Sequence, residues 1–407
     1  MPLVPGHKIA GTVVDTGPQV HVSNPRRVGV IGVAIHPNIR DARRSLEEIL
    51  FDTTREALAD ARLPIEDVDG IVVGANDQYD GRAIAVMAAS GSVGGVDRDI
   101  LSTPSAGEHA FVLGALRVAT GQFRTQLAVA WSPTEASPLR EVQRLAADPY
   151  FHRALPLDET SAHALQASAL LAAVPGVEDA AWAIVDKNRR HGAAAHPGVA
   201  SPVAGLPVAY PLRWPLRADM VAAPTTGAVA VVLASADYIA EHPPGAVAWI
   251  EGMGWATEPS FLGDRKLAFA PALEAAVAQA YAAATITAPL VSFDVAEVSD
   301  TTPYQELLAC EALGFANRGD WLVRAREGAF RKGGKLPVNL SGGALTFNPV
   351  FCTGLIRIAE VANQLRGRAG AHQHRGAARG VAHAASGCAM QYNTVVVLRS
   401  GEIGARP

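Results

Sequence analysis

The protein has 407 residues, of which 49% are hydrophobic, 18% charged and 6% aromatic, and its formal net charge is -4. This length predicts two or three domains or one large duplicated fold, and the apolar fraction excludes a disordered chain. No run approaches the roughly 18–20 apolar residues of a membrane-spanning helix, and mild acidity without basic runs argues against nucleic acid as a partner.

The N-terminal sequence and the cysteine content indicate the cellular compartment. Residues 1–7 lack a basic segment followed by an apolar core, so we do not expect secretion. Cys310, Cys352 and Cys388 are too few for a disulfide framework and form no CxxC pair. The twelve histidines are dispersed, which predicts no metal site. We therefore expect a soluble, cytoplasmic α/β protein.

Strand and helix patterns alternate along the chain after an irregular N-terminal arm. Residues 28–34 are apolar and β-branched, as in a strand buried on both faces. Ser45 and Glu48 have the spacing of a capping box, which predicts a helix that ends before Pro64. Further strands are predicted at 71–74, 127–131, 228–234, 247–253, 290–298 and 394–398, and further helices at 106–120, 164–174, 180–191, 271–284, 304–313 and 355–365. Residues 366–379 are predicted to form an exposed connection.

The two parts of the chain are weakly similar to each other. Each contains a helix, a glycine and then an apolar strand, at 111–131 and at 355–398. This alternation predicts a duplicated α/β fold with buried sheets. The predicted division is an N-terminal arm at 1–26, a first half at 27–244 with a loop insertion at about 131–215, and a second half at 245–407.

Several segments, in one order over residues 27–400, carry a resemblance to a known family. They are EALADA at 56–61, EDVDG at 66–70, KNRRH at 187–191, HP at 196–197, PLR at 215–217, TGAVAVV at 226–232, residues 304–315, LPVN at 336–339 and SGG at 341–343. Together they resemble the thiolase superfamily, within it the sterol carrier protein X and lipid-transfer-protein branch. The resemblance implies a duplicated thiolase fold with α-β-α-β-α layers, usually paired as a homodimer.

Thiolase chemistry needs a cysteine at the start of a buried helix, where the helix dipole favours the thiolate, together with a histidine that activates it. The family's Cys-Ala-Ser-Gly segment aligns with residues 104–107, which places Pro104 at the position of the nucleophile. Ser105 is the neighbouring hydroxyl. It is a candidate nucleophile, or it caps the start of the helix.

The other catalytic positions of the family also carry different residues here. Asn348 replaces the activating histidine. Its amide either donates a hydrogen bond to a thioester oxygen or only stabilises the loop. Asp300 follows a segment in which the expected histidine is missing. It is a candidate base if desolvation raises its pKa, or it caps the next helix. Cys388 lies within about one residue of the position of the family's second cysteine. It is either a catalytic thiol or an inert buried cysteine.

These replacements leave three hypotheses open. The first is a C–C lyase that cleaves an acyl-CoA thioester by a retro-aldol step, as the branch's steroid side-chain aldolases do, often with a small OB-fold, zinc-ribbon partner. Such a reaction needs a base and oxyanion donors but no covalent intermediate. Those aldolases rely on tyrosines, and Tyr304 and Tyr392 are the nearby phenols.

The second hypothesis is an acyltransferase with a relocated nucleophile, Cys388 or Ser105. The third is a non-catalytic subunit. Coenzyme A is expected only as part of the substrate, with no covalently bound cofactor.

Overall fold

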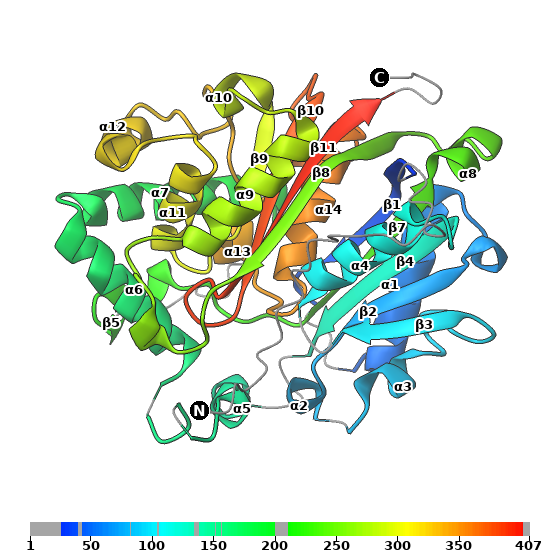
Figure 1. Cartoon of the computed structure of the whole chain (residues 1–407), viewed down its shortest axis with the longest axis horizontal. Coiled ribbons are helices and arrows are strands. Elements are labelled where there is room, and N and C mark those ends of the chain that lie inside the picture. The colour runs from blue at the N-terminus through cyan, green and yellow to red at the C-terminus, as the bar shows by residue number, and fades with distance from the viewer. Residues whose placement is uncertain are drawn as a thin grey trace, which may run out of the picture.

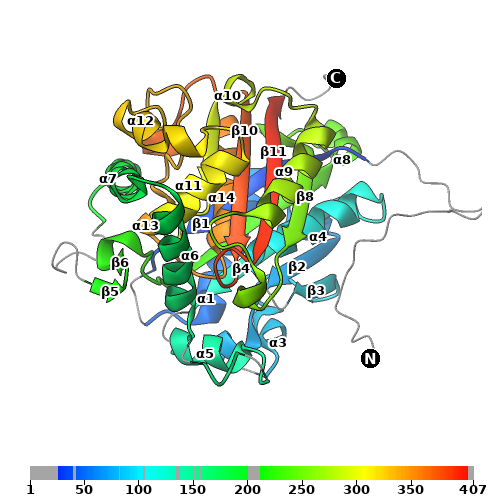
Figure 2. The same ribbon diagram turned by 60° about the vertical axis from the view of Figure 1, so that its left-hand side comes forward.

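A nine-stranded mixed sheet runs through the computed structural model, which describes residues 26–39, 43–81, 83–103, 106–133, 138–150, 152–155, 157–199 and 211–401 (Figures 1 and 2). Its strands are β1 (Val28–His36), β2 (Gly70–Gly74), β3 (Asp99–Thr103), β4 (Thr125–Ser132), β7 (Gly227–Ser235), β8 (Val247–Thr257), β9 (Val295–Val298), β10 (Arg379–Ser386) and β11 (Tyr392–Gly401). The short strands β5 (Pro211–Arg213) and β6 (Leu216–Arg217) pair separately.

The helices fall between these strands. They are α1 (Leu46–Ala61), α2 (Asp77–Asp80), α3 (Ala85–Ala89), α4 (Gly107–Ala119), α5 (Leu139–Ala146), α6 (Glu159–Ala173), α7 (Val177–Ala195), α8 (Ala236–Glu241), α9 (Pro271–Ala284), α10 (Pro289–Ser292), α11 (Pro303–Ala312), α12 (Trp321–Arg326), α13 (Gly343–Thr346) and α14 (Thr353–Leu365). In Figures 1 and 2, α6 and α7 lie on the opposite side of the molecule from α8.

The same strand arrangement occurs twice in the sheet. The first five strands take the order β3-β2-β4-β7-β1, with parallel pairing around β2 and antiparallel pairing from β4 to β1. The remaining strands take the order β9-β10-β11-β8, again parallel and then antiparallel. Val338 extends this second set by a parallel bridge to Ala296, at the place that β3 has in the first set. The repeated order confirms the predicted duplicated α/β fold.

Alternate residues of each strand face different helices, which produces five layers. On β7, Ala230 and Val232 pack with α1, whereas Val231 and Leu233 pack on the side of α4. On β11, valines 395 and 397 face α9, while residues 396 and 398 face α14. Helices α4 and α14 therefore form a shared central layer, and the α-β-α-β-α layering is as predicted.

Two glycines let the central helices approach closely. A Cβ atom on Gly107 would lie 2.9 Å from the Leu355 Cβ, and one on Gly354 would collide with the Glu108 carboxylate. The Gly107 N–H also donates to the Phe351 carbonyl at 2.8 Å. The start of α4 is thus held beside the loop that leads into α14.

The predictions from local sequence signals were confirmed at some elements and wrong at others. The Ser45–Glu48 capping box is present at the start of α1. The strand predicted at 290–298 begins instead with the helical turn α10, because Pro289 occupies its first position, and only β9 is extended. The connection predicted to be exposed contains the buried side chains of Arg366 and His372. Most of the predicted N-terminal arm, residues 1–25, lies outside the described residues.

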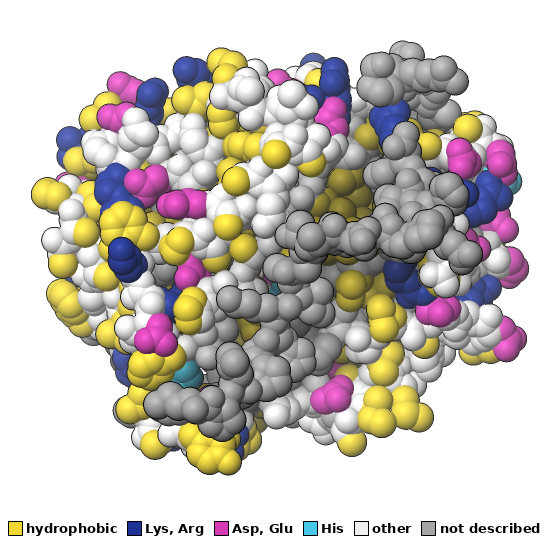
Figure 3. Space-filling view, in the orientation of Figure 1, with side chains coloured by type: hydrophobic (Ala, Val, Ile, Leu, Met, Phe, Trp, Pro, Cys, Tyr) yellow, Lys and Arg dark blue, Asp and Glu magenta, His cyan; other side chains and the backbone are white. Residues whose placement is uncertain are grey.

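Basic and acidic side chains are interspersed over the face drawn in Figure 3. Surface ion pairs join side chains of opposite charge, for example Arg124 with Glu241 at 2.5 Å. None of the helices in the described ranges combines the length and apolar character that crossing a membrane requires. Within the same ranges, no group of three or more His, Cys, Asp or Glu side chains is arranged to hold a metal ion.

Candidate active site

A pocket of about 350 Å³ opens where segments from both sets of strands meet. Helices α5 and α6 form one side, the segment after β6 forms another, and the residues that follow β9 and α13 close it. The lining residues are Leu139, Arg140, Gln143, Asp158, Glu159, Thr160, His163, Leu212, Ala218, Val221, Ala222, Ala223, Pro224, Thr301, Asn348 and Val350. One part of this lining is apolar and the rest combines two acids, an arginine, a histidine, two threonines and two amides, as small-molecule sites do.

The first turns of α6 place the acidic residues and the histidine. Asp158 caps this helix, and its Oδ1 accepts the Ser161 N–H at 2.8 Å. Burial by itself would raise the pKa of Asp158, but the hydrogen bonds from Ser161 and the charge of Arg140 hold it below its usual value. Glu159 and His163 are one helical turn apart, so their side chains lie on one face, with Oε1 and Nε2 3.6 Å apart.

Asn348 also lines the pocket, and its amide orientation is fixed. The Ala222 carbonyl can only accept, so the Asn348 Nδ2, 3.2 Å away, must donate to it. The Thr353 hydroxyl donates to the Asn348 Oδ1 at 2.7 Å. An amide has two N–H groups, and the hydrogen bonds among the described residues use only one of them.

Asp300 does not line the pocket, although Thr301 does. Its carboxylate is fully buried and accepts the Ala344 N–H at 2.5 Å, the Leu345 N–H at 3.3 Å and the Asn188 amide at 2.7 Å. Burial, and then repulsion from Glu306, raise the pKa of Asp300 to about 7. The side chain thus bonds the first turn of α13 and not that of the next helix, α11.

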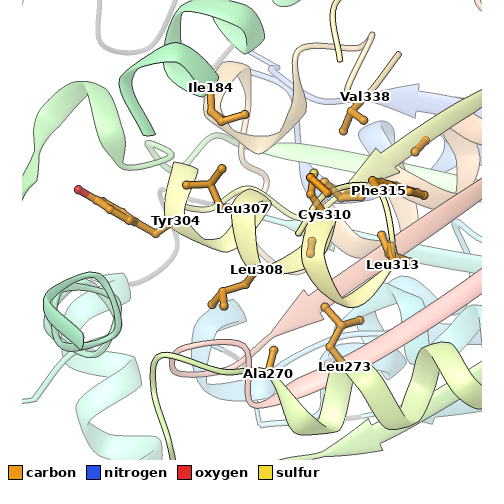
Figure 4. Close-up of a cluster of buried hydrophobic side chains, with 14 of the residues drawn as sticks. Ile184, Ala270, Leu273, Tyr304, Leu307, Leu308, Cys310, Leu313, Phe315 and Val338 are labelled. Atoms are coloured by element: carbon orange, nitrogen blue, oxygen red, sulfur yellow. The ribbon is translucent and has the colours of Figure 1, made fainter. Parts of the chain in front are cut away.

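Tyr304 also lies away from the pocket lining. Figure 4 shows its ring pointing away from the other labelled side chains of the buried cluster. Its hydroxyl is buried and has no hydrogen-bond partner in the described part of the chain. Burial raises the pKa of Tyr304 to about 12, so the phenol stays protonated at neutral pH.

The cysteines are placed in apolar or enclosed surroundings. Cys388 lies between β10 and β11, where its carbonyl accepts from Arg265 at 2.7 Å. Burial raises the pKa of the Cys388 thiol to about 12, against the opposing charge of Arg265. Burial likewise raises the pKa of the Cys310 and Cys352 thiols. Among the described residues, no cysteine lines the pocket.

Ser105 and Pro104 lie outside the described residues. The described structure begins again at Ala106, just before α4. The roles considered for Ser105 therefore stay predictions. The alignment that places Pro104 at the nucleophile position rests on the sequence alone.

The pocket includes residues that the sequence interpretation did not select, namely Glu159 and His163. They belong to the segment predicted as a loop insertion and match no motif. The signal that was available is their spacing, because an acid and a histidine four residues apart face the same side of a helix.

Comparisons with known proteins agree with this architecture. A family model described as "Thiolase C-terminal domain-like" matches residues 256–400. An acetyl-CoA acetyltransferase of Methanothermobacter thermautotrophicus is 32% identical over 194 residues, which are 45% of this chain and 50% of that protein. The chain thus spans about half of this relative's length.

Solved structures cover nearly the whole chain. A structure named "Ltp2-ChsH2(DUF35) aldolase" has a TM-score of 0.75 at 19% identity, covering 93% of this chain and 98% of that chain. A monomeric SCP2-thiolase-like protein type 1 from Mycobacterium smegmatis has a TM-score of 0.65 at 17% identity, covering 92% of this chain and 77% of that one. The protein has the thiolase fold. A sterol carrier protein 2 of Homo sapiens is 40% identical over 91 residues, which are 22% of this chain and 17% of that protein, and this similarity supports the resemblance to the sterol carrier protein branch.

Proposed function

We propose that this thiolase-like protein is a C–C lyase that cleaves a β-hydroxyacyl-CoA thioester by a retro-aldol reaction. The observation that carries the proposal is the composition of the pocket. It combines a carboxylate, Glu159, with an amide donor, Asn348, while the lining in the described ranges includes no cysteine. A retro-aldol cleavage needs these two kinds of group and no covalent acyl-enzyme.

The proposed reaction moves one proton and one electron pair. Glu159 takes the proton of the β-hydroxyl group, and the C–C bond breaks as the hydroxyl oxygen forms a carbonyl. The electron pair of the broken bond passes to the α-carbon and the thioester oxygen as an enolate. Asn348 donates to that oxygen through its second N–H. Glu159 then returns the proton to the α-carbon, which releases a ketone or aldehyde and a shortened acyl-CoA.

We assign the base to Glu159 and not to Asp300, which was the candidate from the sequence. A pKa near 7 would suit a base, but the Asp300 carboxylate is enclosed by three hydrogen-bond donors and does not line the pocket. Direct catalytic roles for Asp300, Tyr304, Cys388 and Ser105 remain predictions without further support here.

The comparisons support the substrate class and suggest a partner. The acetyltransferase relative is named for acetyl-CoA, which supports a CoA thioester as substrate. The aldolase structure is named as a complex of Ltp2 with ChsH2, a DUF35 protein. We therefore include a small OB-fold, zinc-ribbon partner in the proposal. A homodimer and the lack of a covalently bound cofactor are kept in the proposal as what the family resemblance implies.

The test is incubation of the protein with a 3-hydroxyacyl-CoA, with and without a DUF35 partner, followed by mass spectrometry of carbonyl products and shortened acyl-CoA. Glu159→Gln keeps the shape of the side chain but removes the base, so we expect a loss of roughly 10²–10⁴-fold in turnover. Asn348→Ala should lose about 10²-fold or more. Cys388→Ala should retain full turnover.

Two outcomes would overturn the lyase. An acyl adduct on the intact protein that disappears in Cys388→Ala would establish the acyltransferase with a relocated nucleophile. A folded protein that binds the partner but releases no carbonyl product from a series of 3-hydroxyacyl-CoA chain lengths would establish the non-catalytic subunit.

A further inference from the structure

His163 is a buried pocket residue with one ring nitrogen unused. The residue is 2% exposed and lines the pocket, and its Nε2 has no hydrogen-bond partner among the described residues. The nearest acid, Glu159, holds its Oε1 3.6 Å from this nitrogen, which is too long for a hydrogen bond. A buried polar atom without a partner is unusual in proteins, and in a pocket lining it is available to a ligand.

A short chain of amides determines which ring nitrogen carries the proton. The Ala389 carbonyl can only accept, so the Gln166 Nε2, 3.4 Å away, must face it. The Gln166 Oε1 therefore faces Gln305, whose Nε2 donates to it at 3.3 Å. The same Gln305 Nε2 lies 3.1 Å from the His163 Nδ1. Since this amide nitrogen is a donor, Nδ1 must accept.

A neutral imidazole that accepts at Nδ1 carries its proton at Nε2. The opposite tautomer would place the Nδ1 proton against the Gln305 amide protons, so two donors would face each other. The buried amides Gln166 and Gln305 thus leave His163 with one tautomer, and its N–H is directed to the side where Glu159 lines the pocket.

We infer that His163 is a hydrogen-bond donor for the thioester oxygen of the substrate, held in the Nε2–H tautomer by Gln305 and Gln166. The inference rests on the proposed function, because that oxygen belongs to the substrate of the lyase. His163 is the group that contacts the substrate, and Gln305 and Gln166 are positioning residues. His163 keeps its proton throughout the reaction.

The charge on the neighbouring Glu159 carboxylate changes during the proposed reaction in a way that suits this assignment. Before the reaction the negative charge is on Glu159. When Glu159 takes the hydroxyl proton it becomes neutral, and the electron pair of the broken C–C bond places the charge on the thioester oxygen beside the His163 N–H. When the proton passes on to the α-carbon, the charge returns to Glu159. The His163 N–H therefore faces a full negative charge on the thioester oxygen only while Glu159 is protonated and neutral.

The tautomer is measured directly, without any substrate. In protein with ¹⁵N-labelled histidine, long-range ¹H–¹⁵N correlation spectra separate protonated from unprotonated ring nitrogens, and the His163 signals are those lost in His163→Gln. We expect the Nε2–H form in the wild-type protein and the Nδ1–H form in Gln305→Glu, whose carboxylate accepts from Nδ1. An Nδ1–H form in the wild type would overturn the inference. This readout stays valid even if the protein proves to have no lyase activity.

Turnover then separates a donor from a base. Glutamine places an N–H close to the position of the histidine Nε2, so His163→Gln should lose no more than about tenfold in turnover, whereas His163→Leu should lose about 10²–10³-fold. His242→Gln, which alters a histidine stacked on Tyr238, is the matched control and should match the wild type. If His163→Gln is as inactive as His163→Leu while both remain folded, His163 acts as an acid or base and the inference is wrong.

Discussion

At the scale of single residues, the protonation state of the Cys388 thiol distinguishes the proposed lyase from an acyltransferase. Burial raises the pKa of this thiol to about 12, so the reactive thiolate is scarce at neutral pH. We predict that alkylation of native Cys388 by iodoacetamide accelerates about tenfold per pH unit between about pH 7 and 10, without a plateau. Peptide mass spectrometry after timed alkylation measures the rate. Urea-denatured protein, in which all three cysteines should react with an ordinary pH dependence, is the control. A plateau below about pH 9 in the native protein would contradict this prediction.

The candidate site was predictable from the sequence only where motif residues carry it. Asn348 was selected by its alignment with the family's histidine, and it does line the pocket. The four-residue spacing of Glu159 and His163 was the available signal, but spacing alone does not place them in one pocket lining with Asn348, which lies more than 180 residues later in the chain. The enclosure of Asp300 was equally hidden, since two of its hydrogen-bond donors come from α13, 44 and 45 residues later in the chain, and the third comes from α7, 112 residues earlier.

At the scale of elements, the crossing of α4 and α14 depends on glycine. A Cβ on Gly107 would lie 2.7 Å from the Ala130 Cβ and 2.9 Å from the Leu355 Cβ, with no room to move in the central layer. We predict that Gly107→Ala lowers the free energy of unfolding by about 1–3 kcal/mol through overpacking. Urea titration followed by tryptophan fluorescence measures this change. Gly319→Ala is the control, because no atom lies within 4 Å of its Cβ position, and equal midpoints for the two variants would contradict the prediction.

Elements with local signals were predictable, whereas elements fixed by tertiary contacts were not. The helix from Pro271 to Ala284 was predicted with its observed bounds, because a proline starts it and alanine favours it throughout. The edge strand β3 was missed because four of its five residues are exposed or only partly buried and the strand carries no apolar alternation. What holds β3 in the sheet is its parallel pairing with β2.

At the scale of the whole molecule, few contacts join the two sets of strands within the sheet. Between β1 and β8 only Gly29↔Trp249 and Val30↔Ala248 are in register in the described sheet. Packing of α4 on α14 and the side chain of Arg366 add to this joint. From the C-terminal end of α14, Arg366 donates to the Ile31 carbonyl on β1 at 2.7 Å.

The same guanidinium forms a buried ion pair with Asp60 on α1 at 2.7 Å, where its side chain is 1% exposed. Asp60 also accepts the Val33 N–H at 2.9 Å, so its charge is held in place whether or not Arg366 is present. Removing only the Arg366 cation would therefore leave the Asp60 carboxylate, which is 20% exposed, with only the more distant and exposed Arg368 as a cationic partner.

We predict that Arg366→Met lowers the free energy of unfolding by about 3–5 kcal/mol, because breaking one side of a buried pair is far more costly than losing a surface one. Arg368→Met is the matched control. Arg368 lies 3.9 Å from the same carboxylate but is 52% exposed, so its loss should change stability by less than about 1 kcal/mol. Adding Asp60→Asn to Arg366→Met should restore part of the loss, since the unpaired charge is then gone. Urea titration of the four proteins provides the comparison. Equal midpoints for Arg366→Met and Arg368→Met would show that the two sets of strands are held together without this ion pair.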